Sequence, residues 1–417
     1  MKIIIFAGGI GTRLWPLSRK NSPKQFDKIF NGKSTLELAI ARVEPLAGID
    51  NIFVQTIPEF VDAVREQIPA IPEKNIFVEP CRRNVGPAVC YGMMRLRNAG
   101  TPSFEEGGRG MFSTAGTGVR ENEMTRDGAD DNKVICDRAL LTDNSQHAEN
   151  PTPALPSKGR ERDCESVALL WADHLMERVD EFQSALKLGD KLIQTDQNRF
   201  IFLPERPRFA NNNLGWIKVG DSLGEIDGID YFKFEGWKYK PEIEECDRMF
   251  KSGDYFWNPG YFISSVDFIL EQYENLAPTI YANVKKSIDD AENAQEHYEK
   301  AEKVSFDRAL IEKTDLSNAV VIKTNMGWSD PGTLYALKEA LEKSRDANVV
   351  NGNVVELNTK DSLLYNFEKK KILAAVGLDG FVVINTEDAL IVVPKEEVVH
   401  VTNLVEKMGK LGLEEYL

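Results

Sequence analysis

AGGIGTRLWPLSRKNSPKQF, from Ala7 to Phe26, follows directly on the apolar run KIIIF, from Lys2 to Phe6. The apolar run has the length and the β-branched composition of a buried strand. Gly8, Gly9 and Gly11 then come in quick succession. Glycine lets a backbone approach another group closely and adopt conformations that side chains forbid. The pattern predicts a core strand that ends in a loop built for close contact.

Short runs rich in β-branched and aromatic residues alternate with helical patterns through much of the chain. The predicted strands are Lys2–Phe6, Asn51–Thr56, Asn75–Pro80, Ser166–Trp171 and Arg199–Pro204. Helical periodicity covers Ser34–Leu46, Pro87–Ala99 and Val179–Thr195. This alternation predicts an α/β fold with a Rossmann-like, mostly parallel sheet that is covered by helices on both faces. Ligands of such sheets bind at the carboxyl ends of strands, which is where the glycine-rich loop lies.

Two further segments differ in composition from this α/β pattern. Residues 346–417 contain short strands separated by N-G and D-G turns and end in a predicted helix at Val401–Lys410, which indicates a small β-helix-like domain. Residues 101–163 contain seven glycines and only two aromatic residues, so they predict a flexible, low-complexity insertion. A lid over the neighbouring strand is the alternative for this insertion. The first domain is therefore predicted to span residues 1–345.

Composition excludes several classes of protein. The net charge of −15 and the pI near 5.0 argue against binding to nucleic acid or to an anionic membrane. The five cysteines are odd in number and have no C-x-x-C spacing, which favours a reducing cytoplasm over a disulfide framework or a zinc site. No window approaches the roughly 20 apolar residues that a membrane helix needs.

Two cations in the opening loop indicate an anionic ligand. Arg13 can bind two phosphate oxygens with its planar fork, and Lys24 can add a point charge, while backbone N–H groups at the glycines bind further oxygens. An ordinary strand-to-helix turn with surface cations is the alternative. A dinucleotide-binding G-x-G-x-x-G is excluded because Leu14 stands at its last position, and no G-K-[ST] follows to make a Walker loop.

The complete string resembles the signature of the sugar-1-phosphate nucleotidyltransferases. Its TRLWPLSR and PKQF portions are similar to the mannose-1-phosphate guanylyltransferase branch of that family. Other blocks match the family in order: EPCRRNVGPAV (Glu79–Val89), WADH (Trp171–His174), SGDYFWNPGYF (Ser252–Phe262), SFDRALIEK (Ser305–Lys313) and GWSDPGTL (Gly327–Leu334). The resemblance covers nearly everything outside residues 101–163 and implies a GT-A-like nucleotidyltransferase domain.

The resemblance also implies a reaction and its residues. GTP and mannose 1-phosphate would give GDP-mannose and pyrophosphate, with Arg13 and Lys24 as catalytic cations. The implied nucleotide-binding residues are Ala7, Gly8, Gly9, Gly11, Thr12, Glu79, Asn84 and Ala88. The implied sugar-phosphate-binding residues are Gly215, Tyr239, Lys240, Asn258 and Glu312. A homodimer is left open as the assembly.

Asp173 and Asp330 are the predicted ligands of a Mg²⁺ cofactor. A magnesium ion binds through one or two carboxylates together with substrate phosphates, and the family places metal-binding aspartates at both matching positions. Taken alone, Asp173 could cap the helix predicted after it, and Asp330 could be a turn residue before Pro331. His174 is expected to be structural, because transfer to a phosphate oxygen requires little from a base.

The sugar segments depart from the family pattern. The family's F-x-E-K-P reads WKYKP at Trp237–Pro241, so Tyr239 replaces the expected glutamate. A phenol offers one hydroxyl and a ring face where a carboxylate offers two acceptor oxygens. The identity of the sugar therefore stays open. The alternatives are the same chemistry on another sugar or nucleotide, and a non-catalytic nucleotide-sugar sensor.

Overall fold

A computed structural model describes residues 1–9, 12–19, 25–26, 32–99, 165–344 and 346–417 of the chain. All of them belong to one unit, Met1–Thr101 with Cys164–Leu417. The predicted insertion at residues 101–163 lies outside the described residues.

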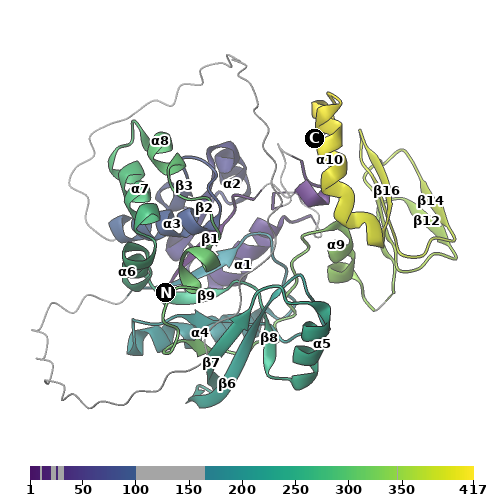
Figure 1. The fold of residues 1–417 in the computed structure, drawn as a ribbon. Coiled ribbons are helices and arrows are strands. Elements are labelled where there is room, and N and C mark those ends of the chain that lie inside the picture. The colour runs from purple at the N-terminus through teal and green to yellow at the C-terminus, as the bar shows by residue number, and fades with distance from the viewer. Residues whose placement is uncertain (10–11, 20–24, 27–31, 100–164, 345) are drawn as a thin grey trace, which may run out of the picture. The chain divides into compact units, whose positions relative to one another are not determined.

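A ten-stranded sheet organises the first domain (Figure 1). In spatial order its strands are β3 (Ile76–Val78), β2 (Ile52–Thr56), β1 (Lys2–Phe6), β4 (Ser166–Trp171), β9 (Phe262–Ser265), β5 (Ile201–Phe202), β10 (Val320–Val321), β7 (Ile229–Lys238), β6 (Gly215–Ile226) and β8 (Tyr255–Asn258). The first four are parallel to one another, whereas β9 is antiparallel to both β4 and β5. The α/β prediction is confirmed, and the half of the sheet beyond β4 is mixed.

The long hairpin of β6 and β7 contributes to this mixed half of the sheet. These strands pair antiparallel and are joined by a tight turn at Asp227 and Gly228, which both have positive φ. A turn this short can join only antiparallel neighbours, because parallel strands need a crossover connection. Only Trp216 and Ile217 of β6 are buried, and the strand contains no continuous apolar run, so the sequence patterns did not predict it.

Helices cover both faces of the sheet. Successive side chains of β1 point to opposite faces, so Ile3 and Ile5 pack on one side and Ile4 on the other, each fully buried. The first face carries α1 (Thr35–Ala47), α2 (Val61–Gln67), α4 (Val179–Thr195) and α5 (Ile243–Ser252). The second face carries α3 (Val85–Ala99), α6 (Val266–Leu276), α7 (Pro278–Asp289) and α8 (Ala294–Glu299). The described helices include none that is long and apolar enough to cross a lipid bilayer.

The C-terminal domain is β-helix-like, as predicted. Its four-stranded sheet contains β11 (Val349–Asn351), β13 (Leu363–Asn366), β15 (Phe381–Asn385) and β16 (Leu390–Pro394), and its two-stranded sheet contains β12 (Val354–Leu357) and β14 (Leu373–Val376). Strands from successive turns of the chain pair in parallel, with Leu363 opposite both Val349 and Val382. The helices α9 (Leu334–Leu341) and α10 (Val401–Lys410) flank the domain.

Candidate functional site

The glycine-rich loop after β1 is held from the protein side by two buried polar side chains. The Gln25 amide donates to the carbonyl oxygens of Ala7, at 3.2 Å, and Gly9, at 2.7 Å. The Thr56 hydroxyl also donates to the Ala7 carbonyl, at 3.0 Å. Carbonyl oxygens repel a phosphate, so their engagement here favours binding of an anion by the loop's N–H groups. Gln25 belongs to the PKQF block, but the sequence analysis gave it no role.

The two predicted catalytic cations are not equally described. Arg13 lies exposed in the short 3₁₀ turn Thr12–Leu14 that follows the glycines. Lys24 and Gly11 lie outside the described residues, and Thr12 is described only in its backbone. The catalytic roles of Arg13 and Lys24 stay predictions.

Glu79 lies beside the glycine-rich loop. A Cβ atom added at Gly8 would be 4.0 Å from Glu79 Oε1, and the Glu79 N–H donates to the Thr56 carbonyl at 2.8 Å. The buried Tyr298 hydroxyl donates to Glu79 Oε2 at 2.8 Å. Burial raises the pKa of Glu79 to about 7, while hydrogen bonds from Gln55 and Tyr298 work in the opposite direction. The carboxylate can therefore change its charge near neutral pH.

Asn84 and Ala88 lie at the start of α3, a few residues after Glu79. Gln55, which hydrogen-bonds Glu79, also donates to the Ala88 carbonyl at 2.7 Å. Asn84 has φ of +69°, and its Oδ1 accepts the Val85 N–H at 2.8 Å. The structure thus links Glu79 to Ala88 through one side chain, with Asn84 at the turn between them. Contact of Glu79, Asn84 and Ala88 with the base of the nucleotide stays a prediction.

Asp173 and Asp330 are brought together by a short antiparallel bridge. The Leu175 N–H donates to the Ser329 carbonyl at 2.9 Å, and the Ser329 N–H donates back at 3.1 Å. Burial raises the pKa of the Tyr261 hydroxyl, and the charges of both Asp173 and Asp330 raise it further. The charges of both aspartates therefore act on the same buried hydroxyl.

The helix-cap alternative for Asp173 does not hold in this structure. Helix α4 begins only at Val179, and Arg178 occupies the N-cap position. Asp173 instead lies two residues past the end of β4, at the carboxyl edge of the parallel strands. Asp330 does lie in a turn, where its carbonyl accepts the Gly332 N–H at 2.7 Å, but its charge still acts on Tyr261.

His174 links the two aspartate segments. Trp328 Nε1 donates to His174 Nδ1 at 3.0 Å, and the Tyr261 hydroxyl lies 3.1 Å from the same nitrogen. Because an indole N–H can only donate, Nδ1 is an acceptor and the proton of the neutral ring is on Nε2, 4.0 Å from Asp173 Oδ1. The His174 main-chain carbonyl is in turn held by the buried Arg42, at 2.8 Å. These contacts orient the segment that carries Asp173.

Glu205 shapes the loop that leads to Asp330. Its fully buried carboxylate accepts the backbone N–H groups of Met326 at 2.9 Å, Gly327 at 2.9 Å and Trp328 at 3.2 Å. Burial raises the pKa of Glu205, and these N–H donors lower it. Sequence reasoning missed Glu205; the only signal was an acidic residue directly after the predicted strand Arg199–Pro204.

Part of the predicted sugar site adjoins the aspartates. Gly215 pairs with Asn258 across β6 and β8, and a Cβ at Gly215 would lie 3.5 Å from that of Asn258. Asn258 Oδ1 accepts the Gly260 N–H at 2.9 Å, and the Gly260 carbonyl accepts the indole N–H of Trp171 at 3.0 Å. Trp171 ends β4, so this turn is fastened near Asp173.

The other predicted sugar residues lie at the surface. Tyr239 is 54% exposed at the end of β7, and Lys240 Nζ lies 5.6 Å from the centre of its ring. Glu312 is exposed directly after the π-helical turn Asp307–Ile311. Their part in a sugar site stays a prediction.

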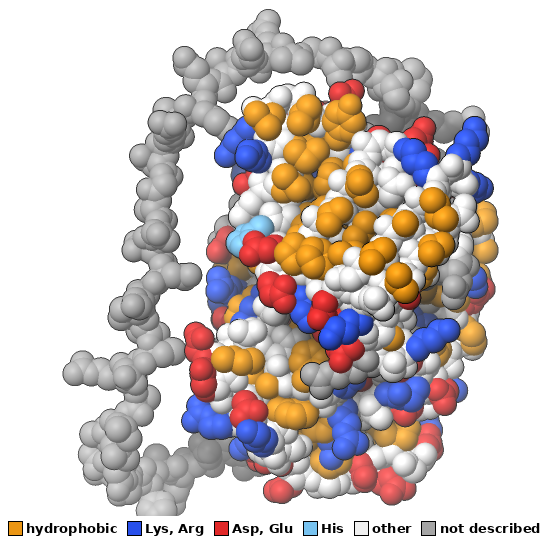
Figure 2. Space-filling view, turned by 90° about the vertical axis from the view of Figure 1, so that its right-hand side faces the viewer, with side chains coloured by type: hydrophobic (Ala, Val, Ile, Leu, Met, Phe, Trp, Pro, Cys, Tyr) orange, Lys and Arg blue, Asp and Glu red, His pale blue; other side chains and the backbone are white. Residues whose placement is uncertain are grey.

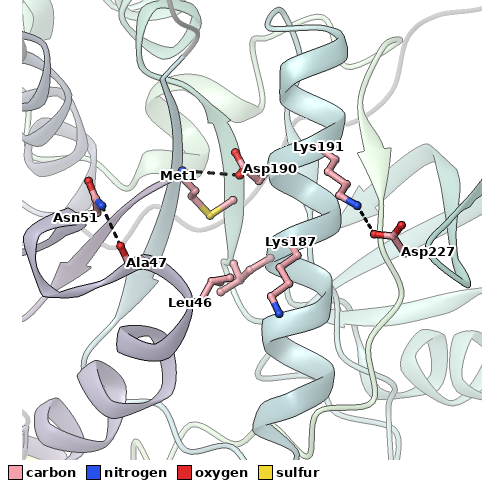
Figure 3. A pocket seen from close by; sticks show the side chains of 9 residues that line it. Met1, Leu46, Ala47, Asn51, Lys187, Asp190, Lys191 and Asp227 are labelled. Carbon is pink, nitrogen blue, oxygen red and sulfur yellow. Dashed lines mark hydrogen bonds and ion pairs between the residues drawn. The ribbon is translucent and has the colours of Figure 1, made fainter.

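A separate pocket lies at the opposite edge of the sheet. It has a volume of about 250 Å³ and is lined by Met1, which precedes β1, and by residues of α1 and α4 (Figure 3). Ion pairs join the Met1 amino group to Asp190 and Lys191 to Asp227 at its wall. Because the pocket lies at the amino end of β1, it is not part of the candidate site, which lies at the carboxyl ends of the parallel strands.

Comparison with known proteins places the chain in a family. A family model described as nucleotidyl transferase matches residues 2–101 and 152–347, and one described as MannoseP isomerase/GMP-like beta-helix domain matches residues 352–408. A mannose-1-phosphate guanylyltransferase of Salmonella muenchen is 26% identical over 97% of this chain and 72% of its own length. One of Sinorhizobium fredii is 28% identical over 97% of this chain and 67% of its own.

A solved structure shares the fold along nearly the whole chain. The crystal structure of mannose-1-phosphate geranyltransferase from Thermus thermophilus superposes with a TM-score of 0.74 at 22% identity, covering 98% of this chain and 99% of that one. The nucleotidyl transferase model, moreover, matches more than half of the chain, in the part that holds the glycine-rich loop and both aspartates. The chain belongs to the nucleotidyl transferase family.

Proposed function

We propose that this protein transfers GMP from GTP to mannose 1-phosphate. An oxygen of the sugar phosphate attacks the α-phosphorus of GTP, the bond from that phosphorus to the bridging oxygen breaks, and pyrophosphate leaves with the electron pair. The observation that carries the proposal is the Leu175–Ser329 bridge, which joins the segment just after Asp173 to the segment just before Asp330. The curated relatives named mannose-1-phosphate guanylyltransferase supply the choice of substrates.

The donor set suits a divalent cation shared with substrate. Nucleotidyl transferases generally use a divalent metal, and we propose Mg²⁺ held by Asp173 and Asp330. Within the described ranges, no three His, Cys, Asp or Glu side chains gather in a way that could hold a metal. Two carboxylates suit Mg²⁺, which takes its remaining ligands from water and phosphates. Bound there, the ion would neutralise phosphate charge.

The protein's own contribution is positioning and charge stabilisation. The attacking group is already a phosphate oxygen, so no general base is required, and His174 is occupied with Trp328 and Tyr261. We propose that the N–H groups of the glycine-rich loop, with Arg13 and Lys24, stabilise charge on the triphosphate and on the leaving pyrophosphate.

Pyrophosphate release across a panel of nucleoside triphosphates and sugar 1-phosphates tests the proposed function. We expect GTP with mannose 1-phosphate to give the highest kcat/KM. A clear preference for another pair would replace the substrates while keeping the reaction class. Absence of pyrophosphate release with every pair would support the nucleotide-sugar sensor instead.

The sugar is tested at Tyr239 by the same panel. Tyr239→Glu restores the acceptor that the family pattern has near the sugar hydroxyls, so it should change the ranking of sugar 1-phosphates and spare the ranking of nucleotides. Because Tyr239 is exposed, the melting temperature of the variant should stay close to that of the wild type. An unchanged sugar ranking would show that this position does not contact the sugar.

Guanine binding should depend on pH through Glu79. An ionised carboxylate accepts hydrogen bonds from the N–H groups on the Watson–Crick edge of guanine, whereas a protonated one is a poorer partner. Because the pKa of Glu79 is about 7, the KM for GTP should fall as pH rises through neutrality. Glu79→Gln should raise that KM and remove its pH dependence. Tyr298→Phe should move the inflection upward, since it removes a hydrogen bond that lowers the pKa.

The same shift has the opposite sign for stability. Between the ordinary value of 4.5 and about 7, folded Glu79 holds a proton that the unfolded chain has released, so stability falls as pH rises across this window. The difference in melting temperature between Glu79→Gln and the wild type should therefore shift in favour of the variant as pH rises through the window. If neither the difference in melting temperature nor the KM for GTP changed with pH, Glu79 would not be part of the proposed guanine-binding site.

We propose a homodimer that forms through the outer face of the C-terminal domain. Hydrophobic side chains gather on the face shown in Figure 2. Those on β12, β14, β16 and the residues beside them that are more than half exposed are Val355, Leu357, Ile372, Val376, Leu390 and Val392. All six are apolar and more than half exposed, and a large exposed apolar patch on a protein surface marks an interaction site.

A second copy is the occupant we propose, because an apolar patch is complementary to the same patch on another copy. Leu357 and Val376 are paired across β12 and β14. Leu357→Lys should therefore give monomers in sedimentation velocity, while Leu223→Lys, on exposed β6, should not. A wild-type monomer would overturn the dimer.

The acidic charge supports a protein without nucleic acid or membrane partners, and the free thiols Cys81, Cys90 and Cys246 support a cytoplasmic location.

A further inference from the structure

Arg19 belongs to the TRLWPLSR block, yet all its donors are used within the protein. Its Nε donates to the Pro16 carbonyl at 3.1 Å. Its Nη1 donates to Asp388 Oδ2 at 3.0 Å and to the Tyr416 carbonyl at 2.7 Å. Its Nη2 donates to Asp388 Oδ1 at 2.6 Å and to the Thr386 hydroxyl at 3.4 Å. A guanidinium has five N–H groups, and each of them has an acceptor here.

A second contact fastens the same loop to the end of the chain. The indole N–H of Trp15 donates to the Tyr416 carbonyl at 2.7 Å. Leu14, Trp15 and Leu17 are buried, and they pack in one hydrophobic cluster with Leu334 of α9 and with residues of the C-terminal domain. Those residues are Leu363, Tyr365, Val382, Ile384, Ile391, Val398 and Val401. The loop after the glycines thus packs into the core of the other domain.

We propose that the C-terminal domain acts in catalysis by positioning the phosphate-binding loop, with Arg19 as the positioning residue and Asp388 as its anchor. Arg19 would therefore not bind phosphate itself, although in the sequence it lies between Arg13 and Lys24, which are both proposed to bind phosphate. Arg13 precedes Arg19 by six residues within the described segment 12–19, so fixing Arg19 restricts where Arg13 can lie. Lys24 follows Arg19 by five residues and lies outside the described residues. Misplacement of a charge-stabilising group by about 1 Å is enough to slow a reaction strongly. This inference rests on the proposed nucleotidyl transfer.

The anchor can be removed without touching the loop. Asp388→Ala takes away the carboxylate that binds both Nη atoms of Arg19, and Asp388 is 41% exposed, so the effect on melting temperature should be small. We expect kcat to fall about 10- to 100-fold, the KM for mannose 1-phosphate to change less than about 2-fold, and Asp388→Glu to recover part of the rate. If Arg19 instead bound phosphate, its release from Asp388 would leave kcat unchanged or raise it.

A matched control and a double mutant separate positioning from general stability. Asp379 pairs with Lys360 at 3.2 Å on the same domain, where both are well exposed, so Asp379→Ala should leave kcat unchanged. In the Arg13→Ala background, Asp388→Ala should lower kcat by a much smaller factor than in the wild type, because the arginine that Asp388 helps to position is already gone. Additive losses would overturn the proposal, as would an equal loss in Asp379→Ala.

A further variant covers the case in which Asp388→Ala fails to fold. Trp15→Phe keeps an aromatic ring but removes the N–H that binds the Tyr416 carbonyl. Trp15→Phe should lower kcat, as Asp388→Ala does. In the Arg13→Ala background it should lower kcat by a much smaller factor than in the wild type. Wild-type enzyme that releases no pyrophosphate at all would count against the proposed function, whereas normal turnover that is insensitive to Asp388 and Trp15 would count against the positioning role alone.

Discussion

Asp173→Asn and Asp330→Asn should each lower turnover by about 10³-fold while the protein stays folded. Asparagine keeps the shape of the side chain and removes its charge. The Leu175–Ser329 bridge joins the segments that carry the two aspartates, and the charges of both act on the Tyr261 hydroxyl, so they form one proposed cation site. Loss of either would leave the triphosphate charge poorly neutralised in the transition state. Pyrophosphate release, measured as a function of Mg²⁺ concentration, tests this expectation.

Binding and stability measurements make the result independent of activity. Calorimetric titration of Mg²⁺ with a non-hydrolysable GTP analogue should show weaker binding in both variants. The matched control is Asp180→Asn, because Asp180 is an exposed carboxylate in the first turn of the nearby α4. It should keep wild-type turnover. Near-normal activity in Asp173→Asn or Asp330→Asn would exclude that residue as a metal ligand.

Glu205→Ala should destabilise the protein by about 3 kcal/mol or more and also lower turnover. The substitution leaves the backbone N–H groups of Met326, Gly327 and Trp328 without the carboxylate that they share. Buried donors without acceptors are costly, so the loop should rearrange. Asp330 lies at the end of this loop, and its displacement would disturb the proposed cation site. The midpoint of denaturant unfolding measures the first effect, and pyrophosphate release the second.

Two companion variants give the Glu205 result its meaning. Glu205→Gln keeps one oxygen to accept N–H groups but presents an NH₂ group to the others, so its loss of stability should be intermediate. Glu225→Ala removes an exposed carboxylate from β6 and should change stability by no more than about 0.5 kcal/mol. Wild-type stability in Glu205→Ala would show that water replaces the carboxylate without strain.

Local patterns were sufficient for the parallel half of the fold. The predicted strands Lys2–Phe6 and Ser166–Trp171 and the predicted helices Val179–Thr195 and Val401–Lys410 have the bounds seen in the structure. Buried strands and amphipathic helices each leave a periodic signal in neighbouring residues. The β6–β7 hairpin did not, because its stability comes from pairing between strands rather than from a continuous apolar run.

In the candidate site, too, some features could be predicted from the sequence and others could not. The sequence by itself indicated the family and predicted the glycine-rich loop and the two aspartates as site residues, because each lies in a block whose residue types and spacing are local. Only the tertiary structure decided how those blocks are held. Glu205 accepts the Gly327 N–H across 122 positions of the chain, and Arg19 meets Asp388 across 369. Such partners leave no periodic trace in the sequence, because their contacts exist only once the chain has folded and brought their polar groups within hydrogen-bonding distance.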